Sequence, residues 1–293
     1  MIDKISNKIS SLVKPDKQFK DKLQIHFPPR TMRESMARNE KVKHLLIIGL
    51  PRSGTSIFQR IMNSFSGVFV AFESIYMPFL GDNSVESLQA YFFEMIKQYH
   101  HLAVINRDIL PKERIKPFTF DETYHYFGDK AIYNTSDDFR SRLKKAADSN
   151  IVDKIIFIVR DPRDRMNSYF NWVDYRDEHY TNTVKPSDRD VTETIRKESE
   201  KWNKFAEDVL HYDRNYDKCI TVTYEDLVKP QAKGIDRVIS HLQLPSDEIN
   251  LDYYHSSVSR TSIDKWKEEL DADISRQITE YCKDYMARFN YQK

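Results

Sequence analysis

The sequence predicts an α/β fold of three layers (α/β/α), in which a central parallel sheet lies between two layers of helices. Short, continuous apolar runs, typical of buried parallel strands, occur at residues 45–48, 68–71, 154–159 and 220–224. Amphipathic stretches with the period of helices separate these runs. Because strands that alternate with helices form parallel sheets covered on both faces, the order of these segments predicts the fold class.

The expected helices follow the strands directly or after short loops. Apolar residues at helical spacing begin at Ile57, after the loop that follows the first strand. Pro162 favours the first turn of a helix after the third strand. Further helices are expected over residues 84–101, 189–212, 231–242 and 272–289.

Residues 1–293 are expected to form a single domain, because the sequence contains no internal repeat and no low-complexity linker. Residues 1–43 are polar and are expected to form an N-terminal helical extension, with apolar residues at helical spacing between Ile2 and Val13. Residues 44–293 are expected to form the core.

The composition excludes several classes of protein. The 46 Lys and Arg residues balance 45 Asp and Glu residues, and a net charge of +1 gives no basis for nucleic-acid binding. The two cysteines, Cys219 and Cys282, provide neither a disulfide framework nor a metal cluster. No signal peptide and no membrane-length apolar run is readable, which predicts a cytoplasmic protein without a membrane partner. Oligomeric state is not predicted.

Glycine is scarce, and its positions indicate an anion-binding loop. Only 6 of the 293 residues are glycine, about 2% where roughly 7% is usual, yet Gly49 and Gly54 lie in one loop between a strand and a helix. Backbone N–H groups at the start of such a helix point toward a phosphate or sulfate. The spacing matches a Walker A loop, but Thr55 replaces the lysine of that motif and Arg52 supplies a cation inside the loop.

This loop resembles the 5′-phosphosulfate loop of the sulfotransferases that use PAPS (3′-phosphoadenylyl sulfate). The usual form in that family is Pro-(Arg/Lys)-Ser-Gly-Thr-Thr, and this sequence has Pro51-Arg52-Ser53-Gly54-Thr55-Ser56. The resemblance implies a P-loop-containing sulfotransferase fold, with PAPS as co-substrate and PAP as product. The residues implied to bind the phosphosulfate are Arg52, Ser53, Gly54, Thr55 and Ser56. No metal is expected, because cationic side chains take the place of Mg²⁺.

Four further residues resemble cofactor contacts of the same family. Arg160 ends a buried strand, where ligands of open α/β sheets bind, and Ser168 follows eight residues later. Their types and spacing match the 3′-phosphate motif, which implies that both bind the 3′-phosphate. Tyr224 resembles a strand-end tyrosine that faces the cofactor, although a core position suits it equally. Arg260 lies in a segment similar to the cofactor lid and is implied to contact a phosphate.

Two residues are implied to act in the transfer step. The sequence is closer to the carbohydrate and tyrosylprotein branch than to the cytosolic aryl branch, and in that branch a glutamate follows the second strand, where Glu73 stands. The resemblance implies that Glu73 is the base. Gly128-Asp129-Lys130 resembles the Asp-Lys-Thr-Pro element of the same branch, which implies that Lys130 stabilises the leaving phosphate. His125 is the alternative base, because the aryl enzymes use histidine.

The predicted function is transfer of the sulfuryl group of PAPS to an acceptor hydroxyl or amine by in-line displacement. A small molecule, such as a natural product or a carbohydrate, is the expected acceptor. Tyr76, Met77, Phe79 and the stretch Phe118–Tyr126 are expected to line its pocket, and residues 171–180 to lie over it. The alternatives are a P-loop kinase-like phosphotransferase and a non-catalytic nucleotide-binding protein.

Overall fold

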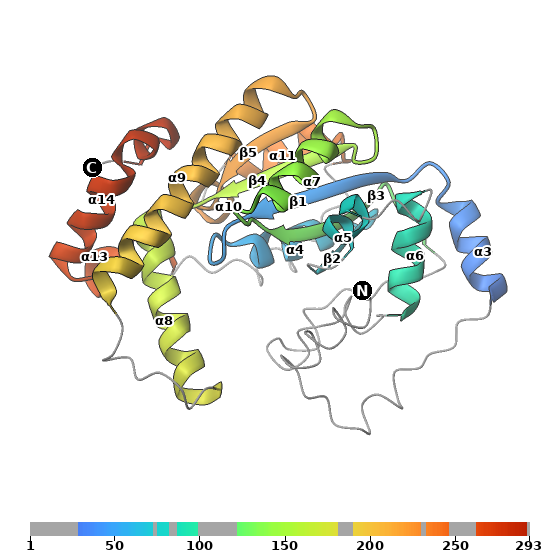
Figure 1. Cartoon of the computed structure of the whole chain (residues 1–293). Helices are drawn as coiled ribbons and strands as arrows, with labels where there is room; N and C mark the ends of the chain where they lie inside the picture. The colour runs from blue at the N-terminus through green and yellow to red at the C-terminus, as the bar shows by residue number, and fades with distance from the viewer. Residues whose placement is uncertain are drawn as a thin grey trace.

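The structure, a computed structural model, describes residues 29–72, 75–81, 87–98, 122–180, 190–229, 233–245 and 262–291. A single parallel sheet of five strands has the order β2-β3-β1-β4-β5 (Figure 1). The strands are β1 (Lys43–Gly49), β2 (Val68–Phe72), β3 (Tyr126–Ile132), β4 (Lys154–Val159) and β5 (Cys219–Thr223). This arrangement confirms the predicted fold class.

Helices connect the strands and cover the sheet. They are α3 (Pro29–Arg38), α4 (Thr55–Asn63), α5 (Tyr76–Gly81), α6 (Leu88–Gln98), α7 (Asp137–Asp148), α8 (Pro162–Tyr180), α9 (Val191–Asn215), α10 (Tyr224–Val228), α11 (Gly234–Leu242), α13 (Trp266–Glu269) and α14 (Ala272–Met286), which continues into the 3₁₀ turn η6 (Ala287–Phe289). Helix α14 packs against α9 and α8 at one end of the sheet (Figure 1). Among the residues that the structure describes, no helix has the length and apolar character needed to cross a membrane.

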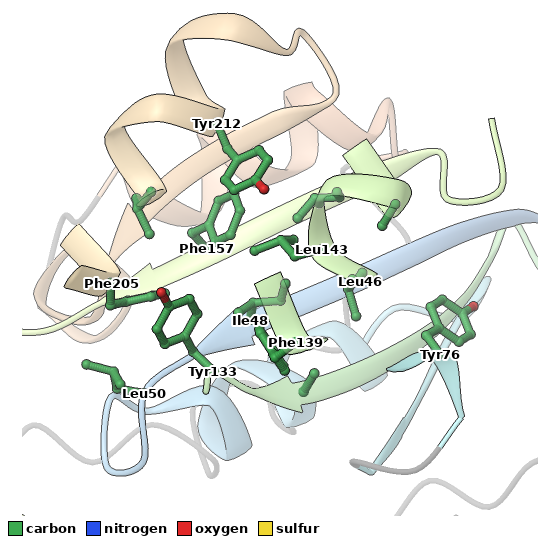
Figure 2. Close-up of a cluster of buried hydrophobic side chains, with 14 of the residues drawn as sticks. Leu46, Ile48, Leu50, Tyr76, Tyr133, Phe139, Leu143, Phe157, Phe205 and Tyr212 are labelled. Atoms are coloured by element: carbon green, nitrogen blue, oxygen red, sulfur yellow. The ribbon is translucent and has the colours of Figure 1, made fainter. Parts of the chain in front are cut away.

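Alternate residues of each strand face opposite layers of helices, as the pleat of a strand requires. In β1, Leu46 and Ile48 belong to a buried cluster shared with α7 and α9, which Figure 2 shows filling the space between the sheet and these helices. Leu45 and Ile47 belong to a second cluster, on the other face, shared with α4 and α11. Burial on both faces explains why the strands are continuous apolar runs.

The apolar pattern does not predict β3, because Asp129 and Lys130 stand in its middle. Both side chains are only 1% exposed. Asp129 Oδ2 accepts hydrogen bonds from the backbone N–H groups of Ile75 and Tyr76, both at 2.9 Å. Lys130 extends to the opposite face, where its Nζ donates to Ser56 Oγ at 3.1 Å. Because each charged group is hydrogen-bonded to another segment, both can lie inside a central strand.

Capping residues decide where two of the elements begin. Asp190 accepts a hydrogen bond from the Glu193 backbone N–H at 2.9 Å, and α9 starts at the next residue. Thr223 Oγ1 accepts one from the Asp226 N–H at 3.1 Å, so Tyr224, expected at the end of a strand, is the first residue of α10.

Asn39 joins the end of the N-terminal extension to the core. The helix expected between residues 2 and 13 lies outside the described residues, whereas α3 lies within the extension. Asn39, just after α3, donates from Nδ2 to the carbonyl oxygen of Glu122 at 3.2 Å and accepts at Oδ1 from the backbone N–H of Tyr124 at 2.7 Å. These bonds fix the end of the extension beside the start of β3.

The loop after β1 passes so close to other segments that two of its positions require glycine. Gly54, at the start of α4, has a φ of 91°, and a Cβ there would lie 2.2 Å from Tyr224 Cδ2. A Cβ on Gly49 would lie 2.6 Å from Thr55 Cγ2 and 2.9 Å from the Ile158 carbonyl oxygen. Two of the few glycines therefore let the loop lie against β4 and α10.

Replacing Gly54 by alanine is expected to lower the free energy of unfolding by about 2 kcal/mol, because the new Cβ is strained at this φ and overlaps the Tyr224 ring. Urea unfolding of Gly54→Ala measures the loss. Gly81→Ala is the control, because a Cβ there would meet only the tip of the Arg142 side chain, which can move. Equal stability of the two variants would contradict the close approach of Tyr224.

Candidate active site

The loop between β1 and α4 has the backbone of an anion cradle. The N–H of Ser53 donates to the carbonyl oxygen of Leu50 at 3.1 Å, and Arg52 and Gly54 have φ angles of 70° and 91°. A positive φ is uncommon at a residue other than glycine and often marks a functional loop. The Ser53 hydroxyl is buried and has no hydrogen-bond partner among the described residues. The loop thus brings an unsatisfied donor to the start of a helix, which favours anions.

Arg160, at the carboxyl end of β4, reaches the same loop. Its Nη1 donates to the carbonyl oxygen of Arg52 at 2.9 Å, and its Nη2 donates to that of Ser262 at 2.5 Å. The guanidinium lies over the Tyr224 ring, 4.5 Å from the centroid. Its Nε is buried and has no partner in the part of the chain that the structure describes. Since a guanidinium carries five N–H groups, Arg160 connects two segments and still has donors for an anion.

Arg52 and Ser168, from different predicted motifs, are in contact. Arg52 Nε donates to Ser168 Oγ, on α8, at 3.0 Å. Partial burial, and then the positive charge of Arg160, lower the pKa of Arg52. Guanidinium groups that lie close together repel each other, and an anion between them relieves this repulsion. The pair therefore favours an anionic ligand.

Lys130 brings a third cation to this loop. It stands in β3, where its Cα pairs with that of Ile47 in β1. The bond from its Nζ to Ser56 Oγ reaches the first turn of α4. Thr55, the neighbouring residue, is buried. The structure thus brings together Arg52, Lys130 and Arg160, from three segments of the chain.

Glu73 lies outside the described residues, but the chain on both sides of it is joined to β3. Phe72, the last residue of β2, pairs with Lys130 in the register of the sheet. Ile75 and Tyr76 donate their backbone N–H groups to Asp129. Asp129 was not expected to have a role, and its only signal in the sequence is its place before Lys130.

Two other predicted cofactor contacts are Tyr224, which lies under Arg160, and Arg260, which lies outside the described residues. His125, the alternative base, is far from the loop. His125 directly precedes β3, and its backbone N–H donates to the Gly67 carbonyl oxygen at 2.7 Å. It is five residues from Lys130 along an extended chain, roughly 16 Å at the usual rise per residue. The geometry therefore separates this alternative base from the cation cluster.

The expectation that Tyr76 and Phe79 line an acceptor pocket is wrong. Residues 118–121 of the expected wall lie outside the described residues. Tyr76 and Phe79 are 0% and 6% exposed, and both belong to the buried cluster on the α7 side of the sheet. The hydroxyl of Tyr76 donates to the carbonyl oxygen of Phe127 at 2.6 Å. These aromatic side chains pack in the core, because α5 lies against the sheet. Of the expected cover, the side chains described are those of Asn171 and Trp172, and both are exposed.

Charged residues after β4 connect α8 to the segment that contains α13. Arg163 pairs with Asp161 at 2.6 Å and stacks on the Trp266 ring, 4.0 Å from its centroid. Asp164 accepts hydrogen bonds from the backbone N–H groups of Asp264 at 2.7 Å and Trp266 at 3.1 Å. The alternating charges of residues 160–165 were the signal for this arrangement. They fix the segment that begins at residue 262 next to Arg160.

The arrangement suits a small ligand with two anionic groups, since three cations surround a helix start. A family model described as "Sulfotransferase domain" matches residues 42–261, about three quarters of the 293 residues. The match includes the loop, Lys130, Arg160 and Ser168. The chain belongs to the sulfotransferase family. A comparison with curated proteins finds no match.

Three solved structures are similar to this sulfotransferase over most of their length. The sulfotransferase domain from the curacin biosynthetic pathway is 15% identical with a TM-score of 0.47, and 86% of this chain and 98% of that chain are covered. A sulfotransferase from Alicyclobacillus acidocaldarius is 14% identical with a TM-score of 0.49, with 84% and 93% covered. Mouse sulfotransferase SULT7A1 complexed with PAP is 14% identical with a TM-score of 0.49, with 89% and 91% covered.

Next to Arg160 in the sulfotransferase lies a buried carboxyl group, that of Glu225, for which the sequence predicted no role. Glu225, in the first turn of α10, accepts a hydrogen bond from the Asp161 backbone N–H at 3.1 Å and one from the Tyr291 hydroxyl at 2.8 Å. Burial raises the pKa of Glu225 from its usual 4.5 to about 7. Its position after Tyr224 in a Tyr-Glu-Asp sequence was the available signal.

The raised pKa of Glu225 predicts how stability depends on pH. The folded protein retains a proton between about pH 4.5 and pH 7 that the unfolded chain loses, so this group makes the protein less stable as the pH rises through that window. A glutamine side chain in its place cannot ionise. The stability of Glu225→Gln relative to the wild type is therefore expected to increase by up to about 3 kcal/mol from pH 4.5 to pH 8.

Urea unfolding at both pH values measures this difference. Glu268→Gln, a change of an exposed glutamate, is the control and is expected to show no such trend. If the difference between Glu225→Gln and the wild type is the same at both pH values, the raised pKa is wrong.

Proposed function

We propose that this sulfotransferase uses PAPS as donor and transfers its sulfuryl group to a hydroxyl or amine of a small molecule. The observation that carries the proposal is the convergence of Arg52 and Arg160 at the helix start, beside Ser168 and the unsatisfied Ser53 hydroxyl. PAPS has anionic groups at both its 5′ and 3′ positions, and two cationic groups from separate strands suit such a ligand.

In this proposal the loop residues 52–56 bind the 5′-phosphosulfate, and Arg160 with Ser168 binds the 3′-phosphate. Tyr224, which is only 1% exposed, supports the guanidinium of Arg160 from beneath, and Arg260 contacts a phosphate from the C-terminal side. PAP is the product that is released. Because arginine and lysine side chains supply the positive charge, the reaction as proposed needs no metal.

In the proposed transfer step, the carboxylate of Glu73 accepts the proton of the acceptor hydroxyl. The acceptor oxygen forms a bond to sulfur as the bond from sulfur to the bridging oxygen breaks. Lys130 and Arg52 stabilise the charge on the departing phosphate. The pairing of Phe72 in β2 with Lys130 in β3 supports the roles of Glu73 and Lys130, because it places the residue before Glu73 beside Lys130.

The family match favours a sulfotransferase over the two alternatives, a kinase-like phosphotransferase and a non-catalytic nucleotide-binding protein. Thr55 stands where a kinase loop has its lysine, and the cations lie in positions suited to two separate anions.

We further propose that residues 44–293 form one catalytic domain, with residues 1–43 as its extension. The hydrogen bonds of Asn39 to the start of β3 support this division.

Binding of PAP is expected to raise the melting temperature more than ADP, or ATP with Mg²⁺, at equal concentration. A ligand at 100 times its Kd stabilises the native state by about 2.7 kcal/mol. Arg160→Ala is expected to abolish the advantage of PAP, whereas the exposed Arg196→Ala is expected to retain it. Equal shifts with all nucleotides in the wild type would exclude recognition of a 3′-phosphate.

Glu73→Gln is expected to bind PAP like the wild type but to transfer labelled sulfate about 100-fold to 10,000-fold more slowly, since amide nitrogen cannot accept the proton. A screen of hydroxyl and amine acceptors with labelled PAPS provides the assay. His125→Ala is the control and is expected to keep the wild-type rate. Loss of transfer in His125→Ala, with full transfer by Glu73→Gln, would reverse the assignment of the base.

A further inference from the structure

The peptide bond between Arg160 and Asp161 is hydrogen-bonded on both sides by buried side chains. Trp202, on α9, donates from Nε1 to the carbonyl oxygen of Arg160 at 3.0 Å. Glu225, on α10, accepts from the N–H of Asp161 at 3.1 Å. The carbonyl and N–H groups of this peptide unit are therefore hydrogen-bonded to different helices. The unit lies between the end of β4 and the start of α8.

Both side chains are hydrogen-bonded to the Arg160–Asp161 peptide and not to the loop that follows β1. Trp202 is 0% exposed and Glu225 is 7% exposed, and both belong to the interior of the protein. Arg160, by contrast, extends from this peptide toward the loop, where it bonds the Arg52 carbonyl oxygen. The orientation of the peptide fixes ψ of Arg160 and φ of Asp161, and so it fixes the direction in which the chain leaves β4. Arg160 is the residue that Trp202 and Glu225 both support, through the peptide that they share.

The C-terminal segment supports both side chains. Phe289 lies edge-on against Trp202, with ring centroids 6.1 Å apart. Two residues later, the hydroxyl of Tyr291 donates to Glu225 at 2.8 Å. The N–H of Tyr291 in turn donates to the carbonyl oxygen of Met286 at 3.0 Å, at the end of α14. One short segment thus fixes the two residues that bond the Arg160 peptide.

We propose that Trp202 and Glu225 are positioning residues for Arg160 and thereby determine how strongly the enzyme prefers a ligand with a 3′-phosphate. This inference rests on the proposed role of Arg160 in binding that phosphate. A guanidinium bonds a phosphate well only in a defined geometry, because its N–H groups are fixed in one plane. Removing either hydrogen-bond partner of this peptide leaves a buried backbone group unsatisfied. The peptide at the end of β4 is then no longer held in one orientation.

The test compares binding of PAP with binding of AMP, which lacks only the 3′-phosphate, by isothermal titration calorimetry. Trp202→Phe removes the indole donor, and Glu225→Leu removes the carboxyl acceptor. Each variant is expected to weaken PAP binding about tenfold, while AMP binding stays within about twofold. Loss of one buried or charge-assisted hydrogen bond typically weakens binding about tenfold. A merely structural role would weaken both ligands alike or neither.

Two matched variants control the experiment. Glu225→Gln keeps an oxygen that can accept from the Asp161 N–H, and it is expected to retain the wild-type ratio of the two affinities. Tyr126→Phe removes a buried aromatic donor to a backbone carbonyl, that of Leu242 at 3.0 Å, at the opposite end of the strands. It is expected to leave the ratio unchanged. Should Glu225→Leu fail to fold, Trp202→Phe decides the test.

The outcomes separate this inference from the proposed function. If Arg160→Ala loses the preference for PAP while Trp202→Phe and Glu225→Leu keep it, the positioning role is wrong and the proposed function stands. If the wild type binds PAP no more tightly than AMP, the proposed role of Arg160 is wrong, and this inference fails with it.

Discussion

Charged side chains are buried within β3 and just after β4, and segments of the sulfotransferase that are distant in the sequence supply their hydrogen-bond partners. An ion removed from water costs several kcal/mol unless it is paired or hydrogen-bonded. Asp129 is bonded by the backbone at the start of α5, and Asp164 by the backbone before α13. Arg165, which is 0% exposed, pairs with Glu198 of α9. Each buried charge thus fixes a helix or segment that is remote in sequence.

The same constraint produces the site. Parallel strands place their carboxyl ends at one edge of the sheet, so residues that follow β1 and β4 lie near the C-terminal half of β3. Arg52, Lys130 and Arg160 converge at this edge although the chain as a whole carries a net charge of only +1. Arg160 depends on this scaffold most directly, because its own peptide is bonded to α9 and α10.

Four of the five strands, and the helices α4, α6, α8, α9, α11 and α14, could be predicted from apolar patterns and, for α8, from the position of Pro162. The strand β3 could not, because a pattern rule treats Asp129 and Lys130 as surface residues. The motifs identified Arg52, Arg160 and Ser168, which the structure brings together. The acceptor wall could not be predicted, since Tyr76 carries no sign of whether it faces the core or a pocket.

The sequence by itself determined the strand–loop–helix unit, the need for glycine in the loop, and which cations accompany it. These features obey local rules of backbone geometry and residue type. Only the tertiary structure decided how the buried charges are compensated. The partners of Arg160 and Asp164, and half the partners of Glu225, are backbone N–H and carbonyl groups. Every residue type except proline has both groups, so no side chain in the sequence marks them. Only folding brings them within hydrogen-bond distance.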